Sequence, residues 1–268
     1  MTQEILVLGA TGKTGRRVVD ALQKTDVTIR AASRSSAVRF DWADRSTWQP
    51  ALAGATGVYL IAPYDSADAA PFVELAGQQG VRRLVLLSGR GLDQTPRDVF
   101  VGMHAAEDAV RASGLEWTVL RANNFTQNFS EQIWEPEIRA GRLSLPMDDT
   151  PEPFVDVRDI AEVAVKALTE DHAGQTYDLS GPVGVTFPDA VAKIAAKTGK
   201  PIEFVQLTPE QYRDALLSYG VSEHEISELN GMFDGMRKGL LATPSDDIAR
   251  LLGRPATSFD DYVADAWG

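Results

Sequence analysis

Hydrophobic positions in the first 122 residues follow two alternating patterns. Short apolar runs bounded by turn residues predict buried strands, and the segments between them place apolar residues at helical spacing. The predicted strands are residues 5–8, 27–32, 38–42, 57–63, 81–89 and 117–121. The predicted helices lie around residues 18–22, 48–52, 69–79 and 102–113. This alternation predicts an α/β fold with a doubly wound parallel sheet.

The pattern changes after residue 122. A strand beginning at Phe154 is expected to lead, through Asp156 or Asp159 as a helix cap, into a helix at 161–168. Further strands are predicted at 142–145, 177–179 and 202–207, and a helix at 187–198. From residue 209 to 267 we expect several short helices, separated by Gly220, Gly231, Gly235 and Gly253. The expected domains are therefore residues 1–125 and a smaller, mainly helical lobe, residues 126–268, interleaved with the end of the sheet.

Composition and charge narrow the possible partners. The chain has 268 residues, of which 44% are hydrophobic, as in ordinary soluble globular proteins. A formal net charge of −12 argues against a nucleic-acid partner, because such proteins usually gather Lys and Arg on one face. The absence of cysteine excludes disulfides, thiolate chemistry and cysteine zinc sites. With no signal segment and no apolar stretch of membrane-spanning length, the sequence predicts a cytoplasmic protein without a membrane partner, and it leaves the oligomeric state open.

The first predicted strand runs directly into a turn with three glycines in the spacing G-x-x-G-x-x-G. Glycine lets the backbone adopt angles closed to side chains and lets phosphate oxygens approach the unpaired N–H groups at a helix start. A strand, such a turn and a helix predict a site for a dinucleotide pyrophosphate, although glycines also punctuate ordinary loops. The candidate cofactor-binding residues here are Gly9, Thr11, Gly12, Lys13, Thr14 and Gly15.

The loop after the second predicted strand indicates which dinucleotide is bound. NAD-binding proteins of this type carry a carboxylate about 20 residues past the glycines, where it binds a ribose hydroxyl. This chain has Ser33 and Arg34 there, with hydroxyls on either side. Because a guanidinium offers a permanent charge and a planar fork of donors, it suits a 2′-phosphate, and the sequence predicts NADP(H). The alternative is that Arg34 is only a solvated loop cation.

Other candidates follow from the rule that open α/β sheets bind ligands beyond the carboxyl ends of their strands. Asp41 could contact the adenine or cap a turn, and the backbone at Ala62 and Pro63 would pass close to the ribose and nicotinamide. Ser88, at the end of the fifth predicted strand, would face the cofactor crevice or serve as a turn hydroxyl. Residues 91–100, which are irregular in pattern, could form a flap.

Several motifs together resemble the NmrA-like branch of the atypical short-chain dehydrogenases/reductases. They cover most of the first 165 residues and comprise the glycine turn, Arg34, Leu87-Ser88-Gly89, His104-Ala105-Ala106-Glu107, 114–121, Asn124-Phe125 with Asn128-Phe129, and 154–161. The segment from Ala32 to Trp42 is also similar to the ergot-alkaloid reductases of the festuclavine and agroclavine dehydrogenase type. The resemblance implies a Rossmann-type sheet that binds NADPH. Members of this branch divide into reductases and non-catalytic NADP-binding regulators, and fold alone does not separate the two.

The chemistry of any reduction is constrained by a missing motif. Ordinary members of the wider superfamily use Tyr-x-x-x-Lys, in which tyrosine protonates the alkoxide formed from a ketone. None of the six tyrosines here is followed by lysine four positions later. An iminium ion already carries positive charge and a quinone can take its proton from water, so either could accept a hydride with little acid assistance. The sequence thus favours an NADPH-dependent reductase of an imine, iminium or quinone. The alternative is an NADP(H)-sensing regulator.

Five further residues are candidates for the substrate side. His104 matches a family histidine at the start of a helix beneath the crevice and could donate a proton, or it could be structural. Asn123 and Asn124 follow the sixth predicted strand and could bind a substrate carbonyl or form a turn. Phe125 belongs to the same motif, and Trp134 could line an apolar pocket or belong to the core. No histidine cluster has metal-ligand spacing, so no metal is expected.

Overall fold

The computed structural model describes residues 3–63 and 68–268. Its packing divides the chain into two compact units. The first extends to residue 122 and takes in residues 157–179 and 250–253 as well; the second comprises residues 123–156, 180–249 and 254–268. The chain therefore enters the second unit at Asn123 and returns to complete the first.

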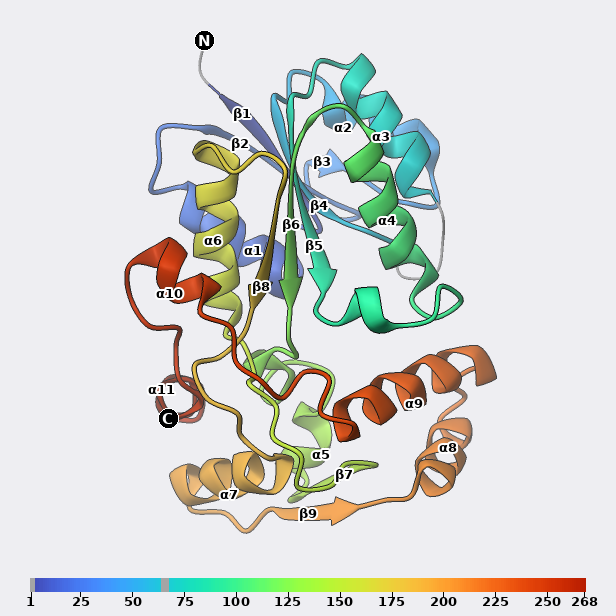
Figure 1. Cartoon of the computed structure of the whole chain (residues 1–268), viewed down its shortest axis with the longest axis vertical. Helices are drawn as coiled ribbons and strands as arrows, with labels where there is room; N and C mark the ends of the chain where they lie inside the picture. The colour runs from blue at the N-terminus through green and yellow to red at the C-terminus, as the bar shows by residue number, and fades with distance from the viewer. Residues whose placement is uncertain (1–2, 64–67) are drawn as a thin grey trace. The chain divides into compact units, whose positions relative to one another are not determined.

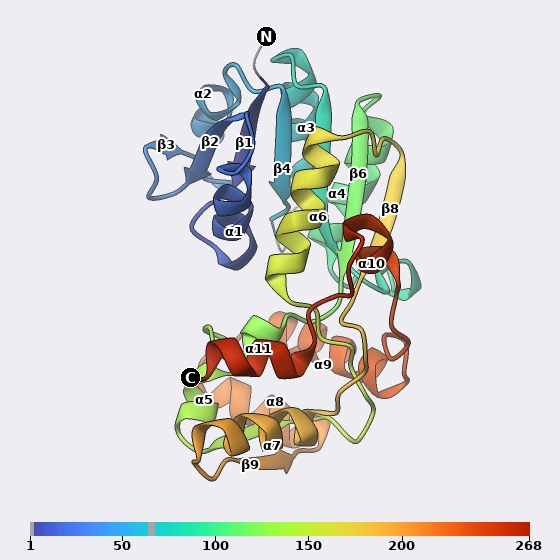
Figure 2. The same ribbon diagram turned by 90° about the vertical axis from the view of Figure 1, so that its left-hand side faces the viewer.

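The first unit is built on a seven-stranded parallel sheet. Its strands in spatial order are β3 (Val38–Arg39), β2 (Thr28–Ser33), β1 (Glu4–Leu8), β4 (Gly57–Ile61), β5 (Arg83–Gly89), β6 (Glu116–Ala122) and β8 (Gln175–Leu179). Helices α1 (Lys13–Leu22) and α6 (Val157–Thr169) cover one face, and α2 (Trp48–Leu52), α3 (Ala69–Gln78) and α4 (Val101–Ala112) cover the other (Figures 1 and 2). The predicted doubly wound sheet is confirmed.

Strand order explains where such a sheet takes a ligand. The chain moves outward from β1 to β2 and β3, and then crosses back to place β4 on the other side of β1. In open α/β sheets, ligands bind at the carboxyl ends of the two strands that flank such a reversal, which here are β1 and β4. The glycine turn predicted to bind phosphate follows β1 directly.

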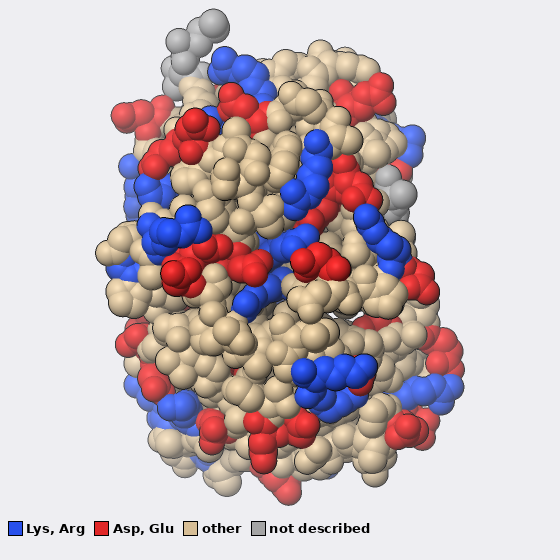
Figure 3. All heavy atoms as spheres, viewed as in Figure 1, with Lys and Arg blue, Asp and Glu red and all other residues tan. Residues whose placement is uncertain are grey.

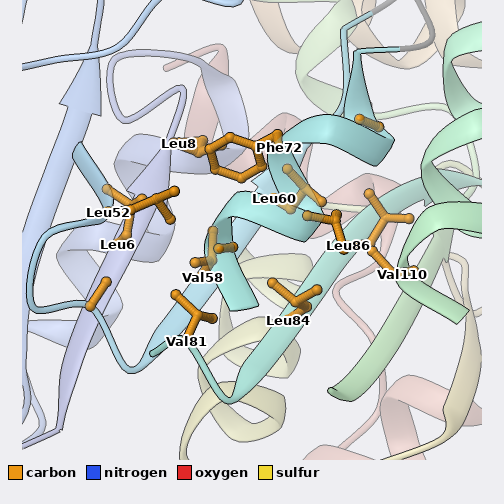
Figure 4. Packing of buried hydrophobic residues seen from close by; sticks show 14 of the residues in the cluster. Leu6, Leu8, Leu52, Val58, Leu60, Phe72, Val81, Leu84, Leu86 and Val110 are labelled. Carbon is orange, nitrogen blue, oxygen red and sulfur yellow. The ribbon is translucent and has the colours of Figure 1, made fainter. Parts of the chain in front are cut away.

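Continuous apolar runs form the strands because both faces of the sheet are covered. Leu6, Leu8, Val58, Leu60, Leu84 and Leu86 point toward α2, α3 and α4, where Phe72 and Val110 close the core (Figure 4). Each of these side chains is fully or almost fully buried. Side chains alternate between the two faces of a strand, so alternate residues of three adjacent strands face the same side of the sheet. The three helices turn apolar side chains, which recur about every 3.6 residues, toward that side, and the two sets form one apolar layer.

The second unit has its own small sheet and an aromatic core. Strand β7 (Arg142–Leu145) pairs in parallel with β9 (Glu203–Gln206). The helices are α5 (Glu135–Arg139), α7 (Phe187–Thr198), α8 (Pro209–Ser218), α9 (Glu223–Arg237) and α11 (Phe259–Ala266), with α10 (Asp247–Leu252) at the boundary of the two units. Phe129, Phe154 and Phe187 pack edge to face or tilted, with centroids 5.1–5.9 Å apart, the arrangement that aromatic quadrupoles favour.

The expectations for residues 154–168 were wrong in two respects. Phe154 begins no strand, because Val155 makes only an isolated parallel bridge with Phe125. Helix α6 starts at Val157, four residues earlier than predicted, and Asp159 lies inside its first turn, where a carboxylate interacts favourably with the helix dipole.

The expected breaks at Gly231 and Gly235 were also wrong, because both residues lie inside α9. A reciprocal capping box between Ser222 and Glu225 fixes the start of this helix, and its buried Phe233 and Met236 hold it against the core. Glycine in a helix costs only about 1 kcal/mol relative to alanine, which such packing outweighs. Gly220 and Gly253 do lie between helices.

Two findings concern membranes and metals. Within residues 3–63 and 68–268, no helix combines the length and the apolar character needed to cross a bilayer. The same described residues contain no group of three or more His, Asp or Glu side chains placed to hold a metal ion.

Candidate functional site

The turn between β1 and α1 is held in one shape by its own backbone. Gly9 has φ +61°, in the left-handed region that favours glycine, and its carbonyl accepts a 2.8 Å hydrogen bond from the Gly12 N–H. A Cβ on Gly15 would lie 2.2 Å from the Gly9 carbonyl oxygen, so only glycine lets α1 start this close to the turn. The sequence motif is therefore required by backbone packing.

The start of α1 has the properties of an anion site. Gly12 is its N-cap, no side chain caps it, and its first turn contains no acidic residue. The first N–H groups of a helix lack intrahelical acceptors and lie at the positive end of the helix dipole, which favours a phosphate. Thr11 and Gly12 are exposed beside this end of the helix. Together with the close approach at Gly15, this geometry fits a dinucleotide pyrophosphate.

Thr14 points into the protein instead of toward solvent. Its side chain is buried beside the hydroxyl of Tyr59, a fully buried residue of β4. Burial raises the pKa of the Tyr59 phenol and the neighbouring Thr14 hydroxyl partly offsets that rise. The Thr14 side chain therefore fixes the helix on the sheet, and the prediction that Thr14 binds the coenzyme concerns its backbone N–H. Lys13, next to it, is half-buried.

The loop after β2 presents a single unpaired guanidinium. Ser33 Oγ accepts the N–H groups of Ser35 (3.2 Å) and Ser36 (3.0 Å) and lies 2.7 Å from Ser36 Oγ, which fixes the loop. Arg34 is exposed, and within residues 3–63 and 68–268 its guanidinium forms no ion pair. Ser33 thus organises the loop and Arg34 is exposed on it; that Arg34 binds a 2′-phosphate stays a prediction.

Replacing Arg34 with alanine is expected to weaken NADPH binding about tenfold and leave NADH binding unchanged, because an exposed charge-assisted contact to the extra phosphate is lost. Calorimetric titration with both coenzymes measures the ratio. Arg82→Ala is a matched control, since Arg82 is also exposed but lies at the amino end of β5, whereas Arg34 follows the carboxyl end of β2. An unchanged preference in Arg34→Ala would mean that another group selects the coenzyme.

Asp41 and the end of β4 are fixed by hydrogen bonds. Asp41 Oδ1 accepts the Ala43 N–H at 3.1 Å, as in a local turn, and the Asp41 carbonyl accepts Trp48 Nε1 at 3.0 Å. Trp42 Nε1 donates to the Ile61 carbonyl at 3.2 Å, immediately before Ala62 and Pro63. Trp42 therefore fixes the backbone that was expected to pass close to the coenzyme.

Ser88 belongs to a buried charge network of the first unit. Its hydroxyl donates to Glu107 Oε1 at 2.8 Å, and Arg121 donates to both Glu107 oxygens at 2.9 and 2.8 Å. Arg111 adds a third donor at 3.2 Å, and Arg121 also pairs with Asp93 at 3.2 Å. Burial alone raises the pKa of Glu107, but the bonds from Arg121 and Ser88 outweigh it and lower the pKa overall. Ser88 therefore links β5 to α4.

His104 is almost fully buried on α4 and anchors residues 91–100. Its Nε2 lies 3.1 Å from Thr95 Oγ1, whose own proton goes to the Leu92 carbonyl at 2.8 Å. Because that hydroxyl can then only accept, Nε2 carries the proton in the neutral ring. The segment predicted as a flap contains a short 3-10 helix, Leu92–Gln94, and an ion pair from Arg97 to Asp108 at 2.7 Å ties it to α4.

Asn123 and Asn124 converge on a buried carboxylate of the second unit that the sequence did not single out. Glu152 is 1% exposed, and its Oε1 accepts Asn123 Nδ2 at 2.8 Å. The backbone N–H and Nδ2 of Asn124 also donate to this oxygen, each at 3.3 Å. Its sequence neighbourhood offered only one signal, namely that Glu152 lies between two prolines in an acidic loop.

The two aromatic candidates lie in different surroundings. Phe125, half-buried, makes the isolated bridge with Val155. Trp134 packs edge to face against Phe129 at 4.8 Å and Phe187 at 5.1 Å, inside the aromatic core. Trp134 is therefore a core residue in this geometry.

Strand order, the glycine turn and the uncapped helix start define a dinucleotide-binding α/β protein. The family model described as "NmrA-like family" matches residues 1–240, and the chain belongs to this family. It is 32% identical to (4-alkanoyl-5-oxo-2,5-dihydrofuran-3-yl)methyl phosphate reductase of Streptomyces griseus, over 97% of both chains. It is 29% identical to agroclavine dehydrogenase of Claviceps fusiformis, over 97% of this chain and 96% of that one.

A solved structure shares the whole fold. The Citrobacter sp. triphenylmethane reductase, complexed with NADP(H), superposes with a TM-score of 0.82 at 22% identity, covering 98% of this chain and 99% of that one. The resemblance to NmrA-like proteins and to ergot-alkaloid reductases is thereby confirmed.

Proposed function

We propose that this protein is an NADPH-dependent reductase that delivers a hydride to a small electron-poor organic substrate, an imine, iminium or quinone. It is an oxidoreductase that uses NADP(H); its relatives are named as a reductase and a dehydrogenase, and the triphenylmethane reductase structure contains NADP(H). The observation that carries the proposal is the phosphate-accepting turn, where a Cβ at Gly15 would clash with the Gly9 carbonyl and no side chain caps α1.

The residues present fit this coenzyme. The backbone N–H groups at the start of α1 would hold its pyrophosphate, and Arg34 its 2′-phosphate. Hydride donation is the chemistry that the reduced nicotinamide supplies when bound. Ser88 and Glu107 fix the carboxyl end of β5 against α4, and Trp42 fixes that of β4, so the protein's contribution at the sheet edge is rigid positioning.

The substrate class follows from what the chain lacks and how His104 is held. No tyrosine has the Tyr-x-x-x-Lys partner that would protonate an alkoxide. His104 Nε2 lies 3.1 Å from Thr95 Oγ1, so this nitrogen already has a hydrogen-bond partner inside the protein. A substrate that needs no acid at the reacting carbon is therefore favoured over an unactivated ketone.

NADPH oxidation, followed by absorbance with a panel of quinones and cyclic imines, tests the proposal. We expect turnover of at least one class, and we expect His104→Gln to keep iminium turnover within about twofold, because general acids contribute roughly 100-fold or more only where a proton is transferred. A drop of about 100-fold would instead make His104 the proton donor. Tight NADPH binding without turnover of any panel member would favour an NADP(H)-sensing regulator.

A further inference from the structure

The order of the strands in the first unit indicates where the nicotinamide half of the coenzyme lies. The turn predicted to hold the pyrophosphate follows β1, and Arg34, predicted to bind the 2′-phosphate of the adenosine half, follows β2. Since β2 and β4 flank β1 on opposite sides, the other half of the dinucleotide extends over the carboxyl ends of β4 and β5. Strand β5 is two strand spacings, about 10 Å, from β1.

The carboxyl ends of β4 and β5 present apolar side chains on one face of the sheet. Ile61 and Leu87 are register partners in the two parallel strands, so their side chains lie next to each other on the same side. Both are half-buried, whereas the residues directly before them are fully buried. A Cβ on Gly9 would lie 3.1 Å from Ile61 Cδ1, so this apolar surface begins beside the glycine turn.

Met103 continues this surface past the end of β5. Gly89, the last residue of β5, lies two positions after Leu87 and shares its side of the sheet, whereas Ser88 between them faces α4, where it donates to Glu107. A Cβ on Gly89 would nevertheless lie 3.4 Å from Met103 Sδ and 4.0 Å from its Cε. The Met103 thioether, which comes from the first turn of α4, therefore reaches over the end of β5 and fills the place of a side chain there.

The start of α4 is fixed in a way that places Met103 at this edge. Phe100, the residue before the helix, has φ +54°, in a region that aromatic residues rarely adopt, and its carbonyl accepts the N–H groups of Met103 at 2.9 Å and His104 at 3.1 Å. Figure 1 shows α4 running back from the level at which β5 ends. Met103 is only half-buried, so part of its side chain is open to a ligand.

We propose that Met103 contacts the nicotinamide ring of the bound coenzyme, and that Ile61, Leu87 and Met103 form an apolar platform under one face of this ring. The inference rests on the proposed coenzyme site and adds the residue that holds its nicotinamide end. A polarisable thioether makes favourable contacts with aromatic rings, and Gly89 leaves the space for it. Because the platform covers one face of the ring, a hydride acceptor approaches the other face.

Calorimetric binding of two matched ligands tests the proposal. The first ligand is NADP⁺, and the second is 2′-phospho-adenosine diphosphate ribose, which keeps the pyrophosphate and the 2′-phosphate but lacks the nicotinamide. Met103→Ala is expected to weaken NADP⁺ binding about fivefold and to leave binding of the fragment within about twofold. Met103→Leu, which restores most of the apolar contact, should recover most of the loss.

The ratio of the two affinities is the deciding quantity, because a merely structural defect weakens both ligands equally. Leu115→Ala is the matched control. Leu115 is half-buried in the same unit but directly precedes β6, at the amino end of the sheet, so this variant should lose stability and keep the ratio.

Methyl NMR detects the contact directly. In protein labelled with ¹³C at the methyl groups of its five methionines, Met103→Leu assigns the Met103 signal, which NADP⁺ should shift through the ring current and the fragment should not. Equal weakening of both ligands in Met103→Ala, or a Met103 signal that does not respond to NADP⁺, would overturn the proposal. An affinity ratio that depends on Met103, without turnover of any quinone or imine, would support the contact and overturn the reductase function instead.

Discussion

Gly15→Ala is expected to lower NADPH affinity about 100-fold. Among glycine-to-alanine substitutions in the first unit, we expect this one to have the largest effect on NADPH binding. The new Cβ would lie 2.2 Å from the oxygen and 2.7 Å from the carbon of the Gly9 carbonyl, and 3.1 Å from the Ala10 Cα. All three are backbone atoms, so the turn and α1 must move apart. A shift of about 1 Å at a binding site can cost 100-fold, and the overpacking itself costs about 1–3 kcal/mol of folding free energy.

Two other glycines give a graded control for this result. A Cβ on Gly12 would lie 3.2 Å from the Gly9 oxygen, so Gly12→Ala should weaken NADPH binding less. In α9 a Cβ on Gly231 would meet nothing within 4 Å, and Gly231→Ala should stabilise the protein by up to about 1 kcal/mol with unchanged affinity. Calorimetry and urea denaturation measure both quantities. Full NADPH affinity in Gly15→Ala would show that the turn is not the phosphate site.

The central sheet could be predicted from the sequence because its strands are covered on both faces. Ile5, Leu6, Val7 and Leu8 are all buried, which makes an unbroken apolar run the correct signal for β1. β8 is one of the two edge strands; it begins with the exposed Gln175, only Tyr177 and Leu179 are buried, and its polar composition concealed its place beside β6. The prediction for helix α9 was wrong because capping and packing outweigh two glycines. The Ser222-x-x-Glu225 spacing was a signal for the start of this helix, whereas the packing of Phe233 and Met236 is not visible in the sequence.

The candidate site was predictable where it depends on local sequence and not where distant residues meet. The turn and Arg34 lie within one short segment, whereas Glu107 is bound by Arg121 and Glu152 by Asn123, partners 14 and 29 residues away. Glu107 had one usable signal, since it lies three residues after His104 on one helix face.

The sequence predicted that the protein has no nucleic-acid partner, and this stays a prediction. On the face shown in Figure 3, basic and acidic side chains are interspersed.

The fully paired state of Glu107 makes it the residue whose loss should destabilise the protein most. Glu107→Ala would leave Arg121, whose side chain is 15% exposed, without its bidentate partner, while the exposed Asp93 and the more distant charge of Asp178 remain. Removing one partner of a buried ion pair costs about 3–5 kcal/mol, a large share of the 5–15 kcal/mol typical of a domain. Urea denaturation should show this loss. Replacing both Glu107 and Arg121 with apolar residues should recover part of it, because the charges that then lose a partner, Arg111 and Asp93, are exposed to solvent.

Lowering the pH should remove the stabilisation that the Glu107 carboxylate gives the wild-type protein. The pKa of Glu107 is lower folded than unfolded, so its stabilisation is fully present above the unfolded value, near 4.3, and is lost as pH falls through the folded value. Wild-type unfolding free energy should therefore fall more steeply below about pH 4.3 than that of Glu107→Gln, which has no carboxyl to protonate. Lys166, paired at 2.7 Å with the exposed Glu170, offers the contrast: Glu170→Gln should change stability by less than about 1 kcal/mol. Parallel acid profiles for wild type and Glu107→Gln would mean that the network does not stabilise the fold through its charge.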